Sequence, residues 1–285
     1  MQTSSKNVVQ IVLILGCLFA AFTMQAQRKR ARSATSNDTL KVLGEFVQVS
    51  NQYQWAPLYL ELTLKNSTNF ITGGEDTAIT NAVFYITKDL SYARFGDAEQ
   101  LVNDSLALLV NDKMQRMIIY SNARPVLAGF RLMTASGRRD SSIQELAKKF
   151  NARYLFTQQN EQIIRLDSRE LLYTTTFSRE SIELQYNATS KEPVRLITIK
   201  RTLYPVAEDV YKQLKDRADM DGKLLTIAEN RFYVVKEQQG SFEYKKIAHD
   251  ANMKLPAVIA DRITRNEEGG FSPLKQYEHY AVTIN

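Results

Sequence analysis

The sequence predicts an α+β fold that is mainly antiparallel β-sheet. Several segments alternate apolar and polar residues with a period of two, which places the apolar side chains on one face of a strand. Asn-Asp pairs separate short apolar runs between residues 91 and 120, and such pairs favour tight turns because both side chains bond nearby backbone. Few segments show the three- and four-residue apolar spacing of a helix. These features predict a β-rich domain with a few covering helices.

The first periodic segment, residues 38 to 52, is expected to be a helix. Asp38 can cap its first turn by accepting hydrogen bonds from the free amides. Leu40, Leu43 and Phe46 recur at three-residue spacing and form one apolar stripe. The pattern therefore predicts an amphipathic helix at the start of the domain.

A strand is expected next, from Tyr59 to Lys65, with Leu60, Leu62 and Leu64 on one face. The continuous apolar run in residues 81 to 88 predicts a strand that is covered on both faces or packed under a helix. A meander of short strands is expected at 91–95, 99–102, 105–110 and 115–120. A helix over residues 99 to 110 is the alternative for part of this region.

The second half is predicted to be β-rich as well. Strands are expected at 154–157, 162–167, 171–177, 181–186 and 194–203, and helices at 142–150 and 205–220. A hairpin is expected with its turn at Gln238-Gln239-Gly240, then a short helix at 255–263 and a last strand at 277–284. We expect a single domain over residues 38 to 285, with a subdivision near 124 to 150 as the alternative.

The N-terminus has the order of a secretory signal peptide. Lys6 precedes an apolar run, Val8 to Phe22, and the small residue Ala26 follows. We expect export with removal of residues 1–26. A retained anchor is the first alternative, although the run is shorter than the roughly 20 residues that a spanning helix needs. Lipidation at Cys17 is the second, because residues 14 to 17 loosely resemble a lipobox.

The positive charge of the chain belongs to its expected N-terminal arm, residues 27–37. The net charge is +6, but without Lys6 and four arm residues 32 basic and 31 acidic residues remain. Those four are Arg28, Lys29, Arg30 and Arg32. The arm has a disordered composition and can touch anionic lipid head groups, or it is a solvated tether. The neutral body argues against a nucleic-acid partner.

No pattern typical of catalysis occurs, so the protein is not expected to be an enzyme or to hold a cofactor. His249 and His279 are thirty residues apart and are expected to be surface residues. The only cysteine, Cys17, lies in the expected signal. No phosphate loop, HExxH motif or nucleophile elbow is present. The fourteen Tyr and thirteen Phe residues predict either an ordinary core or an apolar lipid cavity.

The order of elements resembles the outer-membrane lipoprotein carrier superfamily. A helix leads into the strand of Leu60, Leu62 and Leu64, and the run Val102 to Asp112 has the layout of the family's tight-turned hairpin. It lacks the family's turn glycine, and the extension after Leu203 departs from the family. The resemblance implies an incomplete antiparallel barrel or strongly curved sheet with a lipid cavity. The lining that it implies is Leu60, Leu62, Leu64, Tyr85, Leu106 and Leu108.

Two functions follow for an exported protein without catalytic residues. The first is binding of a lipid or a lipoprotein acyl chain in the apolar β-cavity, in the periplasm or at the outer membrane of a Gram-negative bacterium. The second is a structural or assembly subunit of an envelope or secretion complex, which binds another protein through a sheet edge or through the arm.

Overall fold

The computed structural model describes residues 37–51, 56–87, 89–123, 139–155, 160–173, 175–227, 231–250, 252–267 and 269–285. Residues 36–285 form one compact unit. Its α-helices include α2 (Asn37–Ser50), α4 (Arg139–Lys149) and α5 (Glu208–Leu214). Among the described residues, no helix is both long enough and apolar enough to span a membrane.

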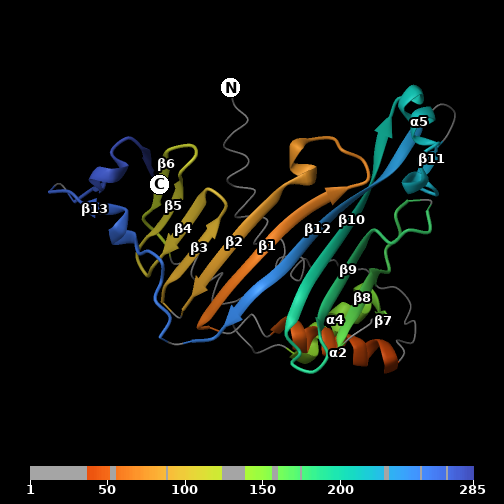
Figure 1. Ribbon diagram of the computed structural model, residues 1–285, viewed down its shortest axis with the longest axis horizontal. Helices are drawn as coiled ribbons and strands as arrows, with labels where there is room; N and C mark the ends of the chain where they lie inside the picture. The colour runs from red at the N-terminus through yellow and green to blue at the C-terminus, as the bar shows by residue number, and fades with distance from the viewer. Residues whose placement is uncertain are drawn as a thin grey trace. The chain divides into compact units, whose positions relative to one another are not determined.

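Thirteen strands of the described chain form one large sheet (Figure 1). Its main path runs β15 (Ala281–Ile284), β6 (Arg116–Tyr120), β5 (Ala107–Asn111), β4 (Ala98–Val102), β3 (Ser91–Phe95), β2 (Ile79–Ile86), β1 (Leu58–Thr68), β12 (Phe232–Ala248), β10 (Pro193–Val206), β9 (Glu180–Asn187), β8 (Glu161–Ser168) and β7 (Phe150–Leu155). Off this path, β11 (Leu224–Thr226) pairs with β12, while β13 (Ile263–Arg265) and β14 (Phe271–Pro273) pair only with each other.

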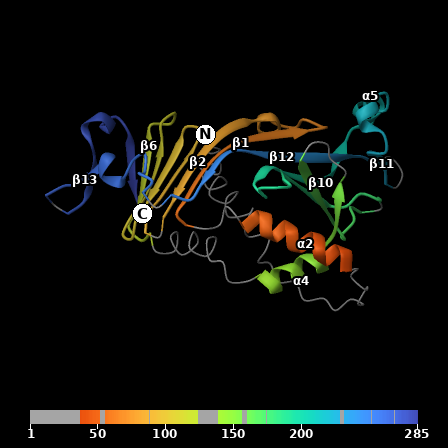
Figure 2. The same ribbon diagram turned by 60° about the horizontal axis from the view of Figure 1, so that its bottom comes forward.

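The sheet is antiparallel along this path except where β15 runs parallel to β6. β15 and β7 are its two edges and do not pair with each other, so the sheet is curved but not closed into a barrel (Figure 2). The predicted class, a mainly antiparallel open or incompletely closed sheet with a few helices, is confirmed.

The central strand β12 has 17 residues and corrects one prediction. Gln238, Gln239 and Gly240 pair with β1 on one side and with β10 on the other. The expected hairpin turn at these residues is therefore wrong, because two neighbouring strands satisfy the backbone groups that a turn would leave free. A Cβ at Gly240 would lie 3.2 Å from Oγ1 of Thr198, so close side-chain approach accounts for this glycine without a turn.

The meander predicted for residues 91 to 120 is confirmed as β3 to β6. Its turns use asparagine as expected: Oδ1 of Asn103 accepts hydrogen bonds from the amides of Ser105 and Leu106 at 2.9 and 2.8 Å. Oδ1 of Asn111 accepts one from the amide of Met114 at 2.8 Å. The alternative helix over residues 99 to 110 is wrong, because β4 and β5 pair there as an antiparallel ladder.

Several boundaries in the second half differ from the prediction. The described part of residues 171 to 177 is not a strand, because the amide of Leu172 donates to the carbonyl of Phe177 at 2.8 Å and folds the segment back. The helix expected from residue 205 begins at Glu208, since Pro205 still pairs with β12. The helix expected at 255–263 shortens to the 3-10 turn Ile259–Asp261, and the last strand begins at Ala281.

The helices α2 and α4 cover one face of the sheet over β7 to β10. Figure 2 shows the two helices together on this side of the sheet. Leu43 and Val49 of α2 and Leu146 of α4 pack there on buried residues of the strands. The buried strand residues of this helix-side core are Phe150, Ile164, Leu166, Leu184 and Tyr186. The sequence predicted both helices, and their apolar stripes bury as expected.

The C-terminal segment covers the other face, over β3 to β6. Ala257, Ile259 and Ile263 pack on Leu101, Leu108, Val110, Met117 and Ile119. Arg262 holds the segment to β4, because its Nε and Nη2 donate to the two carboxylate oxygens of Glu99 at 2.8 and 3.0 Å. A bidentate pair of this kind fixes the orientation of the C-terminal segment on β4 as well as its position. This C-terminal core therefore seals that face.

A buried ion pair holds the loop after β1 against β12. Nζ of Lys236 lies 2.8 Å from Oδ2 of Asp76, and their side chains are only 6% and 8% exposed. The amides of Thr72 and Gly73 also donate to this carboxylate, at 2.7 and 3.2 Å. The Lys236 ammonium and the Thr72 amide hold the pKa of Asp76 well below its usual range.

Leu108→Ala should destabilise the protein more than Leu109→Ala. Leu108 is fully buried in the C-terminal core, whereas its neighbour Leu109 points to the other face and is half-buried. We expect a loss of about 2–5 kcal/mol for Leu108→Ala, from lost burial and a residual cavity, and a clearly smaller loss for Leu109→Ala. Urea unfolding of both variants measures this, and equal losses would contradict the assignment of faces.

Asp76→Asn should cost about 3 kcal/mol near neutral pH, because it leaves the buried Lys236 ammonium without its counter-charge. Asp76 has a lowered pKa in the folded state, so its stabilisation is present above the unfolded-state pKa of about 3.9 and is lost as the pH falls towards the folded-state value. The difference between wild type and variant should therefore shrink below about pH 4. Unfolding at pH 7 and pH 3 measures it, and a difference independent of pH would contradict it.

Candidate functional site on the open face of the sheet

The face of β1 to β6 opposite the C-terminal core is apolar. Leu60 pairs with Phe84, and the antiparallel register carries the same face through Ala93 and Gln100 to Leu109. Ile118 lies opposite Leu109 on β6 and continues this row to the last antiparallel strand. Side chains directly opposite each other in a ladder share a face. We call this surface the open face; its large aliphatic and phenylalanine residues are Leu58, Leu60, Leu62, Leu64, Phe84, Ile86, Phe95, Val102, Leu109 and Ile118.

The open face is only partly exposed: residues in its middle are buried, as are Leu58, Val102 and Ala107 in the row where β1 begins, and other residues of the face keep some exposed surface. Leu62 and Phe84 are 6% and 5% exposed. Leu60, Leu64, Ile86, Phe95, Leu109 and Ile118 are half-buried, and Tyr120 beside them is 38% exposed. The helix-side core contains no residue of β1 to β6. Some of the large apolar side chains on this face thus keep solvent-accessible surface, whereas over β3 to β6 those on the opposite face are covered by the C-terminal segment.

The six residues predicted to line a cavity do not share one face. Leu60, Leu62 and Leu64 lie on the open face, but Tyr85, Leu106 and Leu108 pack in the C-terminal core. Tyr85 pairs with Tyr59 and Tyr92, one position out of step with the leucines. A single cavity lined by all six residues is therefore ruled out by the register, because neighbours along a strand point to opposite faces.

The sequence analysis missed the open-face residues of the neighbouring strands. Phe84 on β2 pairs with Leu60, and Ile86, Leu109 and Ile118 lie on the same face of β2, β5 and β6. Residues 83 to 86 and 106 to 110 are apolar at consecutive positions. The sequence therefore does not show which of these side chains point to which face of the sheet. Only the pairing of Leu60 with Phe84 shows which residues of β2 share a face with the leucines, and this register cannot be read from the sequence.

A polar cluster fixes α2 to β7 and to the turn between β9 and β10. Glu45 of α2 accepts hydrogen bonds from Tyr154 and Lys191 at 2.5 and 2.6 Å. Burial raises the pKa of Glu45, but the bonds from Lys191 and Tyr154 lower it more, so the pKa lies below its usual value. Burial and the bond to Glu45 raise the pKa of Tyr154 to about 12. Glu45 is therefore ionised and the tyrosine is neutral at physiological pH, which keeps this bond intact.

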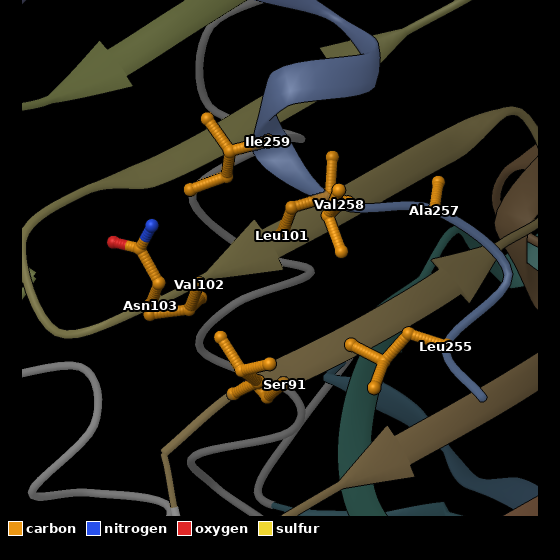
Figure 3. A pocket seen from close by; sticks show the side chains of 9 residues that line it. Ser91, Leu101, Val102, Asn103, Leu255, Ala257, Val258 and Ile259 are labelled. Carbon is orange, nitrogen blue, oxygen red and sulfur yellow. The ribbon is translucent and has the colours of Figure 1, made fainter. Parts of the chain in front are cut away.

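A small pocket lies between the ends of β3 and β4 and the C-terminal segment (Figure 3). Ser91, Leu101 and Asn103 line one side of it, and Leu255 and Ile259 line the other. Its volume of about 40 Å³ compares with about 300–1,000 Å³ for ligand pockets. The pocket can hold a water molecule but not an acyl chain.

Among the described residues, no group of three or more His, Cys, Asp or Glu side chains could hold a metal ion. Nδ1 of His249 lies 3.0 Å from the carbonyl oxygen of Pro57, and the ring of His279 packs edge-on against Tyr280. The expected membrane-contact residues Arg28, Lys29, Arg30 and Arg32 and the expected lipidation site Cys17 lie outside the described residues.

No family model matches the sequence, and no curated protein matches it. Solved structures do match. A LolA superfamily protein from Nitrosomonas europaea matches over 78% of this chain and 96% of its own, at 6% identity and a TM-score of 0.25. An outer membrane lipoprotein-sorting protein domain from Vibrio parahaemolyticus matches over 75% and 94%, at 8% identity and a TM-score of 0.26.

A DUF1329 family protein from Desulfovibrio piger matches over 77% of this chain and 96% of its own, at 9% identity and a TM-score of 0.29. Two of these names belong to the superfamily that the layout of the sequence resembles. TM-scores below 0.5 carry no argument about function, so the matches are a likeness to lipoprotein-sorting proteins and no more than that.

Proposed function

We propose that this chain is a non-catalytic, exported protein of the bacterial envelope that binds the acyl chain of a lipid or lipoprotein on the open face. The observation that carries the proposal is the partial exposure of Leu60, Leu64, Leu109 and Ile118 on a sheet whose opposite face is covered over β3 to β6 by the C-terminal segment. Apolar side chains that keep accessible surface on one face of a sheet are a candidate contact surface for an apolar ligand.

An acyl chain suits this surface for a physical reason. The backbone groups of β1 to β5 already bond to neighbouring strands on both sides, so a ligand needs to supply only apolar contact. Complete burial of a leucine side chain is worth about 1.5–3 kcal/mol, and covering one that is already mostly buried yields at most about a third of this. Several such residues together favour binding, against the cost of immobilising the ligand.

The location of the protein forms part of the proposal. The order of Lys6, the apolar run and Ala26 supports cleavage after residue 26 and a place in the periplasm or at the outer membrane. The basic residues 28 to 32 would then begin the mature chain and make transient contact with anionic membrane surfaces. Anchoring through a lipidated Cys17 is the alternative.

A structural or assembly subunit is the second candidate function, and the edge strand β15 favours it. Its sequence, Ala281 to Ile284, has no charge and no proline, and the side chain of Ile284 is 54% exposed. Edge strands usually carry a charged residue or a proline, which prevents unwanted pairing with another strand. An unprotected edge can accept a strand from a partner protein.

Leu64→Gln should weaken acyl-chain binding about tenfold, because it puts a polar amide on the open face. Ile79→Gln is the matched control: Ile79 is opposite Lys65, so it points to the other face, and it is 68% exposed. The probe is anthroyloxy-labelled palmitate, titrated by fluorescence against delipidated protein. We expect Ile79→Gln to bind like wild type; equal weakening in both variants, or no saturable binding at all, would contradict the proposal.

N-terminal sequencing of the exported protein should give Gln27 as its first residue. The expectation follows from the short apolar run and the small residue at position 26. Recovery of a chain that begins with an acylated Cys17 would instead show that the protein is anchored as a lipoprotein.

A further inference from the structure

Arg116 lies at the outer end of the open face. It is the first residue of β6 and pairs with Asn111. Its neighbour Met117 is fully buried in the C-terminal core, so the side chain of Arg116 points to the opposite, open face. The Arg116 side chain is exposed, and it makes no hydrogen bond or ion pair within the part of the chain that the structure describes.

Other arginines of the sheet are paired with carboxylates. Arg165 lies 2.6 Å from Glu183, Arg201 2.7 Å from Glu237 and Arg262 2.8 Å from Glu99. All three of these pairs lie on the face opposite the open face, as the register of β4, β9 and β12 shows. Arg116 thus differs from them both in its side of the sheet and in its lack of a counter-charge.

The carboxylates nearest to Arg116 in the chain do not neutralise it. Asp112, in the turn before β6, lies 3.4 Å from Arg94 and accepts a hydrogen bond from Tyr280. Asp97 lies in the turn between β3 and β4, two strands away from β6. Arg116 pairs with the neutral Asn111 on β5 and with Ala281 on β15, and neither residue carries a charge. The guanidinium therefore remains available to an anion from outside the chain.

The spacing of the strands fits a ligand with an anionic end and an apolar tail. From Arg116 the row on the open face runs through Asn111 and Ala98 to Phe95, Ala82 and Leu62. Five steps between strands span about 24 Å. The hydrocarbon of one bilayer leaflet is about 15 Å deep, half of the roughly 30 Å core. A chain whose head group sits at Arg116 would therefore end within the apolar part of the face.

We propose that the open face takes acyl chains that carry an anionic head group, a carboxylate or a phosphate, and that Arg116 binds this group. This inference rests on the proposed acyl-chain binding and adds the charge of the ligand. Arginine suits the role because its planar fork matches both oxyanions, which can each accept two parallel hydrogen bonds.

The test compares anthroyloxy-labelled palmitate with its neutral methyl ester, both titrated against the delipidated exported protein. Wild type should bind the acid about fivefold more tightly than the ester, a modest factor because the pair is solvent-exposed. Arg116→Gln should remove this preference and leave the affinity for the ester unchanged, whereas Arg116→Lys should retain part of the preference. Lys113→Gln is the matched control, because it removes one positive charge from the same hairpin and should behave like wild type.

The outcomes separate the two proposals. Equal binding of acid and ester by wild type, or the same loss of preference in Lys113→Gln and Arg116→Gln, would overturn the role of Arg116 while acyl-chain binding stands. Failure of both probes to bind would overturn the proposed function itself. Competition by lysophosphatidic acid and by inorganic phosphate distinguishes the sources of the anion: we expect the first to displace the labelled acid, and displacement by inorganic phosphate alone would overturn the requirement for an acyl chain.

Discussion

The pairing of β12 with both β1 and β10 is the constraint on which the rest of the structure depends. β12 runs without a break for 17 residues, and its neighbours belong to opposite halves of the chain. β1 starts the N-terminal meander, whereas β10 closes the strands that follow α4. Without this shared strand the two halves would be separate sheets, each with an additional edge to protect.

A continuous sheet has two faces, and the two halves cover different ones. The helices α2 and α4 bury the face of β7 to β10, while the C-terminal segment buries the opposite face of β3 to β6. On the uncovered side of the second half, charged residues such as Arg165, Glu183 and Arg201 form ion pairs. On the open face of the first half, most of the residues are apolar. This difference makes the open face a candidate binding surface, whereas the charged residues on the other face satisfy one another in ion pairs.

Much of the fold was predictable from local pattern. The strict alternation around Leu62 set the first strand and its apolar face, and the asparagines at 103 and 111 marked the turns of the meander. The side of each strand was not predictable where both faces are apolar, which is why Tyr85 and Leu108 were assigned to the wrong face. Gln238 to Gly240 resemble a turn by composition, but long-range pairing with β1 and β10 overrides that preference. Such pairing is a property of the whole sheet and leaves no local trace in the sequence.

Native mass spectrometry of protein purified from the envelope fraction of the cells that make it, followed by extraction and identification of bound lipid, tests the proposed acyl-chain binding most directly. We expect the folded chain to carry one acyl-bearing molecule, which is released on unfolding because the open face is lost. Recovery of lipid-free protein with a stoichiometric protein partner would contradict acyl-chain binding and would support the assembly subunit instead.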